Sequence, residues 1–226
     1  MSDIFREVDD DIRQEKYHRL WKRFGGLIIG AAVLVVVGTG GYRGWLYWQE
    51  TQSQQAGDTY FEAVQLSESG NYIEAEELFG KLETATGGYP AIARLRAAAT
   101  LSKAGKESEA RSAFEAISRD SSVPGTLQDV AALRAAYLAV DTEGYTAIAD
   151  RVEGLTGAEN PFRFAAREIL ALSAWKEGDV TAARKWITDL SDDPATPTDV
   201  TRRVDILSKV MDAAHGGAPE AEGAAQ

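Results

Sequence analysis

The residue types that carry most enzymatic and metal chemistry are scarce in this chain. Cysteine is absent, which rules out disulfides, thiolate nucleophiles and cysteine-bound metals. The two histidines, His18 and His215, lie near opposite ends of the sequence, and neither has a second ligand at the spacing of a zinc site. No phosphate-binding glycine loop and no Gly-x-Ser-x-Gly nucleophile motif occurs.

Carboxylates are the remaining candidates for chemistry. Asp9–Asp11 are consecutive, but they lack the alternating ligands and the glycine of a calcium-binding loop. Glu74, Glu76 and Glu77 lie on a predicted helix, where their spacing is typical of a solvated surface rather than of paired catalytic acids. The sequence therefore predicts a protein that is not an enzyme, with no catalytic residues, no metal site and no cofactor.

The net charge of −11 is distributed unevenly along the chain. Residues 1–48 hold seven Lys or Arg and six Asp or Glu, whereas residues 49–226 hold 17 and 29, a net charge of −12. A segment this acidic repels phosphate backbones and anionic lipid headgroups, so nucleic acid is not an expected partner. The acidic excess keeps a soluble domain in solution, and an acidic docking patch is the alternative interpretation.

A long apolar run predicts one transmembrane helix over residues 24–48. From Gly25 to Tyr42 there are eighteen consecutive uncharged residues, among them the run Val33–Val37. At ~1.5 Å per residue they form about 27 Å of helix, close to the ~30 Å hydrocarbon core of a bilayer. Valine favours strands, but strands rarely reach this length without a turn.

Residues suited to a membrane interface lie at both ends of this span. Aromatic rings settle at the level of the headgroups, and arginine side chains extend toward water. The predicted interface anchors are Trp21, Arg23, Arg43, Trp45 and Trp48. Membrane lipid is therefore an expected partner.

Two pairs of glycines give the span small faces, Gly26 with Gly30 and Gly40 with Gly44. Glycines four residues apart on a helix let a second helix approach closely. Glycine is also common in membrane spans in general. Two interpretations stay open: another membrane helix docks at these four residues, or the glycines reflect only the usual composition of membrane spans.

The flanks of the span predict its orientation. Residues 13–23 hold five Lys or Arg, whereas residues 44–80 hold none. The positive-inside rule then places residues 1–23 in the cytoplasm and the domain of residues 49–214 in the periplasm. A cleavable signal peptide is the alternative, but its apolar core is normally about 7–15 residues long and ends in small residues, unlike Tyr42–Trp45.

A repeated pattern follows the span. Each readable copy has a glycine, an alanine five residues later and a large apolar residue four positions further on. The glycine can end one helix in a left-handed conformation, the alanine lets the next helix cross closely, and the large residue fills the groove between them. The predicted packing residues are Gly70, Tyr72, Ala75 and Phe79, then Gly105, Ala110 and Phe114, and finally Gly178, Ala183 and Ile187.

The period of the pattern is close to 34 residues. The second copy follows the first after 35 residues and the last follows after 73 more, while the intervening Asp141–Ala149 is helical in character but has lost the glycine and the alanine. Weaker matches in the preceding helices place Ala63, Ala98 and Ala171 at packing positions. These residues resemble tetratricopeptide repeats, which implies an all-α fold in which the transmembrane helix precedes a right-handed array of helical hairpins.

Breaks at glycine and proline predict the bounds of the helices. Helices are expected at about residues 45–69, 72–85, 90–104, 106–119, 126–140, 142–153, 161–177, 179–191 and 197–214. The first of these is expected to continue from the span without a break. Residues 215–226 are rich in Gly, Ala and Glu, and they predict a disordered tail.

The anchor and the repeats together resemble one known family. A basic and aromatic segment, Leu20–Gly25, leads into the span, which closes with Tyr42–Gln49. This arrangement resembles the YfgM-like ancillary subunits of the SecYEG translocon, tetratricopeptide proteins of bacterial inner membranes. Their anchors typically end in a Gly-Trp-Arg-Tyr-Trp-like string, whose order Gly44–Trp48 keeps with the arginine moved to Arg43.

The resemblance implies a non-enzymatic, protein-binding subunit that assists protein export. Its expected partners are the SecYEG translocon, a membrane-anchored periplasmic chaperone of the peptidyl-prolyl isomerase type and unfolded exported proteins. A general envelope scaffold for another inner-membrane complex is the main alternative. A membrane-bound enzyme accessory with a small-molecule site is a third.

Overall fold

The computed structural model describes the backbone of residues 3–214 and the side chains of residues 21–214 other than Ile28. These residues form helices and no strand, which confirms the all-α class, and the predicted tail lies outside them. The elements are α1 (Asp3–Glu68), α2 (Tyr72–Lys81), α3 (Tyr89–Lys103), α4 (Glu107–Ser118), α5 (Gly125–Ala139), α6 (Tyr145–Val152), α7 (Arg163–Glu177), α8 (Val180–Ser191) and α9 (Thr198–Ala214), with the 3₁₀ turns η1 (Leu82–Thr84) and η2 (Glu153–Leu155).

The chain divides into two units, residues 1–54 and residues 55–226. Helix α1 belongs to both, because it runs without a break from Asp3 to Glu68, as expected for the join between span and repeats. Within the described residues it is the one helix long and apolar enough to cross a membrane, with a mean hydropathy of 2.0 in its most apolar stretch. Its aliphatic side chains face outward: Leu34 is 74% exposed. An exposed apolar surface of this size is typical of a site that meets a membrane or another protein.

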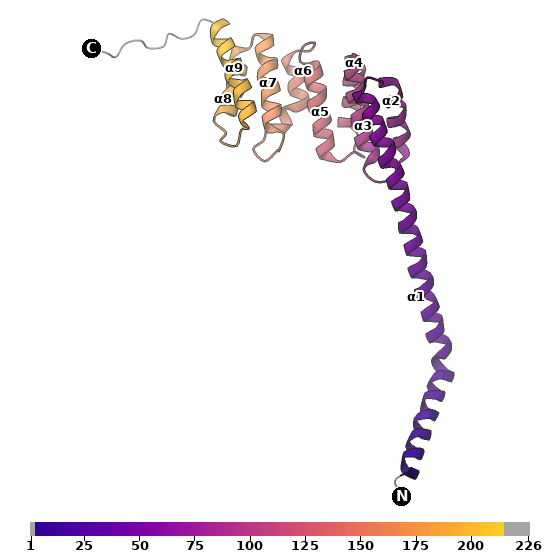
Figure 1. Ribbon diagram of the computed structural model, residues 1–226. Helices are drawn as coiled ribbons and strands as arrows, with labels where there is room; N and C mark the ends of the chain where they lie inside the picture. Colours follow the sequence, from indigo (N-terminus) through magenta and orange to yellow (C-terminus); the bar gives the residue numbers. More distant parts are fainter. Residues whose placement is uncertain (1–2, 215–226) are drawn as a thin grey trace, which may run out of the picture. The chain divides into compact units, whose positions relative to one another are not determined.

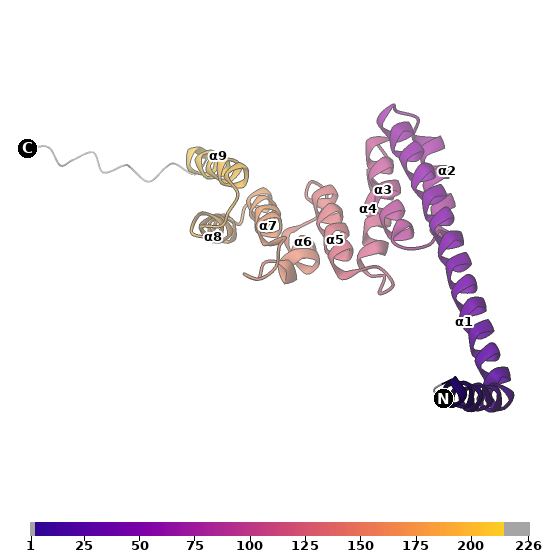
Figure 2. The ribbon, with the colours of Figure 1, turned by 60° about the horizontal axis from the view of Figure 1, so that its bottom comes forward.

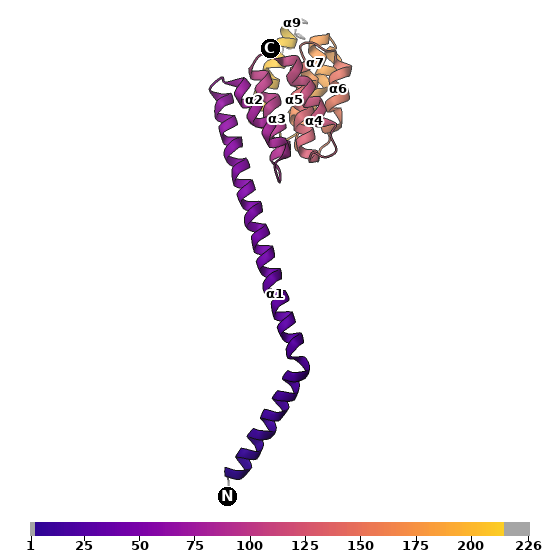
Figure 3. The ribbon, with the colours of Figure 1, turned by 90° about the vertical axis from the view of Figure 1, so that its right-hand side faces the viewer.

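The second unit is a row of helical hairpins, whose members follow one another in chain order (Figure 1). The end of α1 packs with α2 through one core cluster. Helix α3 pairs with α4, α5 with α6 and α7 with α8, and α9 packs against α7 and α8. Figure 2 shows α5, α7 and α9 in one row and α6 and α8 in another. From the side, α3 to α7 lie roughly parallel or antiparallel to one another (Figure 3).

Three of the hairpin turns are closed by a glycine in the left-handed conformation. The φ angles of Gly70, Gly105 and Gly178 are 88°, 78° and 85°. After Gly178, the amide of Asp179 donates to the carbonyl of Ala174 at 2.9 Å, and the equivalent bond follows the other two glycines. This is the Schellman arrangement, which satisfies carbonyls at the end of a helix. The helices predicted over residues 90–104, 106–119 and 179–191 are confirmed, within one residue at each end.

The third hairpin makes its turn in a different way. The amides of Thr142 and Glu143 both donate to the carbonyl of Ala139, and no left-handed residue follows α5. Helix α6 therefore begins at Tyr145, three residues later than predicted. Two side chains of α7 stabilise this turn from outside. Lys176 Nζ donates to the carbonyl of Val140 at 2.9 Å, and Glu177 Oε2 accepts from the amide of Tyr145 at 2.7 Å.

The structure locates the third copy of the repeat and explains why its period fails. Val152 takes the place of Phe114 after 38 residues, and Ile187 follows after 35. Ile148 stands where the other copies have alanine, and both Ile148 and Val152 are buried. The loss of the glycine and the alanine was predicted. The three additional residues lie between Phe114 and Ala136, in the stretch that contains the end of α4, the loop of residues 119–124 and the start of α5.

An alanine in the first helix of each hairpin is buried at the point where helices meet. The four residues share exposed fractions of 0–1% and are Ala63, Ala98, Ala136 and Ala171. A methyl side chain lets the helix axes approach closely, and larger apolar residues of the second helices fill the space beside it. The array is therefore built from one packing unit used four times.

The turn glycines generate a prediction about stability. We expect Gly178→Ala to lower the free energy of unfolding by about 1 kcal/mol, because left-handed backbone costs an L-residue ~1–2 kcal/mol. Gly80→Ala is the matched control. Gly80 lies inside α2, and an added Cβ there meets nothing within 4 Å. This change should raise stability by about 0.5–1 kcal/mol. Urea unfolding followed by circular dichroism measures both, and shifts in the same direction would contradict the assignment.

Candidate protein-binding face

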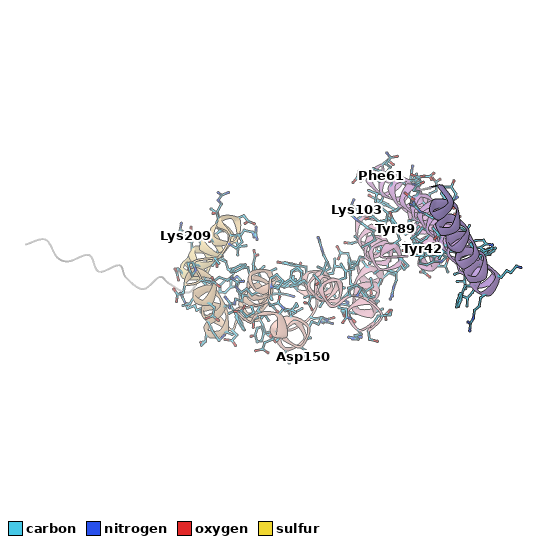
Figure 4. The ribbon with its side chains drawn as sticks, turned by 90° about the horizontal axis from the view of Figure 1, so that it is seen from below. Tyr42, Phe61, Tyr89, Lys103, Asp150 and Lys209 are labelled. Carbon is cyan, nitrogen blue, oxygen red and sulfur yellow. The ribbon has the colours of Figure 1, made fainter. Side chains whose placement is uncertain are left out.

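The second unit has two faces, which we name by the helices that form them. The inner face consists of α3, α5 and α7 with the ends of the row, residues 55–68 of α1 and helix α9. The outer face consists of α2, α4, α6 and α8. Phe61 and Lys103 lie along the inner face, and Asp150 of α6 lies on the opposite side (Figure 4). Rows of hairpins commonly present one such extended face to a partner.

The α1 end of the inner face is aromatic. Phe61 is 70% exposed, which is unusual for a ring of this size in a soluble domain. Behind it, the ring of Tyr60 packs edge-on against Phe79 at 6.0 Å and lies 6.2 Å from the ring of Tyr89. Arg96 Nε donates to Tyr60 Oη at 3.1 Å. The aromatic cluster is thus held rigidly, and Phe61 beside it offers a ring to a partner.

Three basic side chains on this face lack an ionic partner. Arg96 and Arg134 stand at equivalent positions of α3 and α5, and Lys103 ends α3. None of the three forms an ion pair with any carboxylate of the described residues. Cations without an ion pair on an exposed face are available to acidic groups of a partner.

At the α9 end of the inner face, a buried carboxylate of α7 pairs with an arginine of α9. Glu168 of α7 is 6% exposed, and Arg203 of α9 binds both of its oxygens at 2.5 and 2.8 Å. The hydrogen bonds to Glu168 raise the pKa of Arg203. Beside them, burial raises the pKa of Tyr137, and the negative charge of Glu168 adds to the effect. This bidentate pair fixes the last helix of the row to α7.

Ion pairs between a first helix and the loop after its hairpin recur with the repeat. Arg94 contacts Asp120 at 2.6 Å, and Arg167 contacts Asp193 at 3.4 Å, the two pairs being 73 residues apart. Hydrogen bonds from Ser122, and then from Arg94, hold the pKa of Asp120 well below its usual range. Sequence reasoning missed both pairs. The signal was present, because both members shift by the spacing that separates Gly105 from Gly178.

A second ionic network joins the outer helices α4 and α6. Arg151 contacts Glu115 at 2.8 Å and Glu143 at 2.5 Å, and Arg111 contacts Glu143 at 2.8 Å. The hydrogen bond from Arg151 lowers the pKa of Glu143. Neighbouring hairpins are therefore linked by charge on the outer face as well as by apolar packing.

The packing residues predicted from the repeat lie between helices rather than on the inner face. Three alanines of the second helices are fully buried, and Tyr72 is half-buried at the start of α2. The large residues Phe79, Phe114 and Ile187 are 1%, 3% and 9% exposed, and the alanines are Ala75, Ala110 and Ala183. These side chains, with Gly70, Gly105 and Gly178 at the turns, position the face that a partner would meet.

The predicted interface anchors are exposed on α1. Trp21, Trp45 and Trp48 are 55–58% exposed, and Arg23 and Arg43 are exposed as well. The guanidinium of Arg23 lies 5.7 Å from the centre of the Phe24 ring, and the rings of Tyr42 and Trp45 are 6.4 Å apart. Their role at a membrane interface stays a prediction.

The four glycines of the span have open surroundings. An added Cβ at Gly26, Gly30, Gly40 or Gly44 would meet nothing within 4 Å. No packing inside the described chain therefore requires glycine at these positions. Docking of another membrane helix against them stays a prediction.

The described residues contain no group of three His, Asp or Glu side chains arranged to hold a metal ion. The side chain of His18 and the whole of His215 lie outside the described part of the chain. The exposed features of the second unit are rings and unpaired charges on helices. Such features are typical of surfaces through which repeat arrays contact other chains.

Comparison with known proteins identifies one family. The model of the tetratricopeptide repeat-like domain matches residues 18–185. No curated protein matches the chain. No solved structure matches it. The matched residues include both the apolar helix and most of the hairpin row, so anchor and repeats belong to one family pattern.

The buried carboxylate at the α9 end generates a second prediction. Arg203→Met removes the cation from Glu168, and we expect it to lower the free energy of unfolding by about 2 kcal/mol, because an unpaired buried charge is costly. Glu168→Gln in the same chain should restore most of this loss, since a neutral amide is easier to bury. The neighbouring, exposed Arg202→Met is the control and should change stability by less than about 0.5 kcal/mol.

A double-mutant cycle from urea unfolding gives the result. The assignment fails if Arg203→Met leaves stability unchanged, or if the double variant is no more stable than the single one.

Proposed function

Since the chain belongs to the tetratricopeptide repeat-like domain family, we propose that it is a membrane-anchored, protein-binding subunit without catalytic activity of its own. The observation that carries the proposal is the inner face, where an exposed ring and three unpaired cations lie on a rigid row of hairpins. Repeat arrays of this kind offer extended surfaces to other chains. Partner binding, rather than chemistry on a small molecule, matches this surface.

The proposal includes an anchor of defined direction. Residues 24–48 span the inner membrane of a bacterium, residues 1–23 stay in the cytoplasm, and the hairpin row of residues 49–214 works in the periplasm. The support is the exposed apolar surface of α1 and the five basic residues on its N-terminal side.

The finer proposal is an accessory role beside the SecYEG translocon. The anchor would dock to the channel through its glycine faces, and the inner face would hold unfolded exported proteins or a membrane-anchored chaperone of the peptidyl-prolyl isomerase type. Two features support this role: the likeness of Gly44–Trp48 to the end of the YfgM-like anchors, and the open surroundings of the span glycines.

Reporter fusions test the direction of the anchor. Alkaline phosphatase fused after residue 214 should be active in intact cells, because the positive-inside rule places that end in the periplasm. A reporter that functions only in the cytoplasm should be silent at the same position. The reverse pattern would contradict the orientation and, with it, the role in export.

Site-specific photocrosslinking in native membranes tests the partners. A reactive group at Gly30 or Trp48 should give adducts with translocon subunits, because these positions lie on the proposed docking helix. The same group at Phe61 should capture exported proteins or the chaperone. Asp150, exposed on the outer face, is the matched control and should give few adducts. Repeated recovery of another inner-membrane complex from Gly30 and Trp48 would contradict the Sec assignment and favour a general envelope scaffold.

A further inference from the structure

A groove runs between the second helices α2 and α4, away from the inner face. It consists of two cavities of about 440 and 410 Å³. Both are lined by Glu76 and Leu101, so they adjoin and form one channel along α2. The groove exists because α2 and α4 each pack on α3 and leave a gap over it.

The floor of this groove is apolar, and glycine and alanine occur on both of its sides. Its floor is formed by Leu101 and Ala97 of α3, and Ala113 and Ala116 of α4 face Gly80 of α2 across it. Small side chains on both walls let the ridge of another helix enter closely, as in the contacts between helices inside the protein. The groove can therefore accommodate the side chains of another helix.

One end of the groove carries a large exposed apolar side chain. Ile73, in the first turn of α2, is 81% exposed, and it lines the first cavity together with Leu101. An isoleucine this open loses contact with water only when another chain covers it. Covering this side chain removes apolar surface from water, which favours binding.

The rim of the groove carries unpaired negative charge. Glu74, Glu76 and Glu83 line it and form no ion pair within the described residues. The two cations at its edges are already engaged, Arg94 by Asp120 at 2.6 Å and Lys106 by Glu109 at 3.8 Å. No Lys or Arg occurs from residue 44 to residue 80. The local field at this groove therefore favours a cation.

A second outer groove, between α4 and α6, supplies a comparison within the same molecule. Its cavity is also about 440 Å³, and its lining likewise holds three carboxylates and two cations. Arg151 and Arg119 line it and both contact Glu115, at 2.8 and 3.6 Å. Asp129 and Asp150 complete its rim. Its similar size, without an exposed apolar side chain such as Ile73, makes it the control for the position of the charge.

We propose that the α2–α4 groove docks a short amphipathic helix of a partner protein, with aliphatic residues on one face and Lys or Arg beside them. The aliphatic face would cover Ile73 and the alanine-lined floor, and the cations would meet Glu74, Glu76 and Glu83. A helix of about 12 residues, ~18 Å long, matches α2 and α4, which have 10 and 12 residues. This site is separate from the inner face, so it adds a second attachment point to the proposed function.

Fluorescence anisotropy tests the proposal on the full chain in nanodiscs of zwitterionic lipid. The probe is a labelled peptide of about 12 residues with Leu, Ala and Lys in helical spacing, and its partner has every Lys replaced by Glu. We expect the Lys peptide to bind, the Glu peptide to bind at least about tenfold more weakly, and added salt to weaken the first. Empty nanodiscs give the background from lipid.

Two changes in the groove should reduce binding for different reasons. Glu76→Lys with Glu83→Lys reverses the rim charge and should weaken the Lys peptide about tenfold or more, which corresponds to ~1.4 kcal/mol. Ala116→Trp fills the groove without a change of charge and should weaken it as well. The matched control, Asp129→Lys with Asp150→Lys, makes the same charge change in the second outer groove and should leave affinity within about twofold. Circular dichroism shows that each variant is folded.

Each other outcome would overturn the proposal. Equal losses from the two pairs of charge reversals would mean that the peptide responds only to net charge. Unchanged affinity in Ala116→Trp would mean that the peptide lies elsewhere. Equal binding of the Lys and Glu peptides, or no binding of the Lys peptide, would contradict the proposal that the glutamates of the groove attract a basic helix. None of these outcomes depends on the translocon, so a failure here leaves the proposed function standing.

Discussion

The close crossing of two helices over a buried alanine is the contact on which the second unit depends. Ala63, Ala98, Ala136 and Ala171 occupy this position in the four hairpins, and all are essentially inaccessible to solvent. A methyl group sets the distance between helices, and every larger side chain nearby must fit that distance. This distance between helices determines how the two faces of the row and the grooves on its outer side are formed. It also determines which charged side chains are close enough to pair.

Charged side chains have two roles in the row: some form ion pairs between helices, and others stay unpaired on its surfaces. The paired residues, such as Arg94 with Asp120 and Arg203 with Glu168, join one part of the row to another. Because they already have a partner within the chain, they are less available to another protein. The unpaired residues include cations such as Arg134 on the inner side and carboxylates such as Glu76 beside the α2–α4 groove. A row of nearly equivalent hairpins therefore presents two different surfaces, which suit different partners.

The third hairpin shows how a repeat survives the loss of its local signals. It has no left-handed glycine, and Ile148 replaces the alanine of the second helix, yet its helices pack in the same order. Lys176 of the next hairpin donates to the carbonyl of Val140, whose equivalents accept from the glycine amide in the turns at Gly105 and Gly178, and Glu177 accepts from the amide of Tyr145 at the start of α6. Tertiary contacts thus replace a local cap at one position, because an unsatisfied backbone group near a helix end must find some partner.

The sequence by itself determined the helical class, the apolar span, the three glycine turns and most helix bounds, because all of these depend on residues close together in the chain. Periodicity, a positive φ at glycine and a run without charge are local properties. Tertiary structure alone decided the register of the third hairpin, the pairing of Glu168 with Arg203 and the groove between α2 and α4. These features join residues of different helices, and three additional residues between Phe114 and Ala136 hide the third copy of the repeat from a search at fixed spacing.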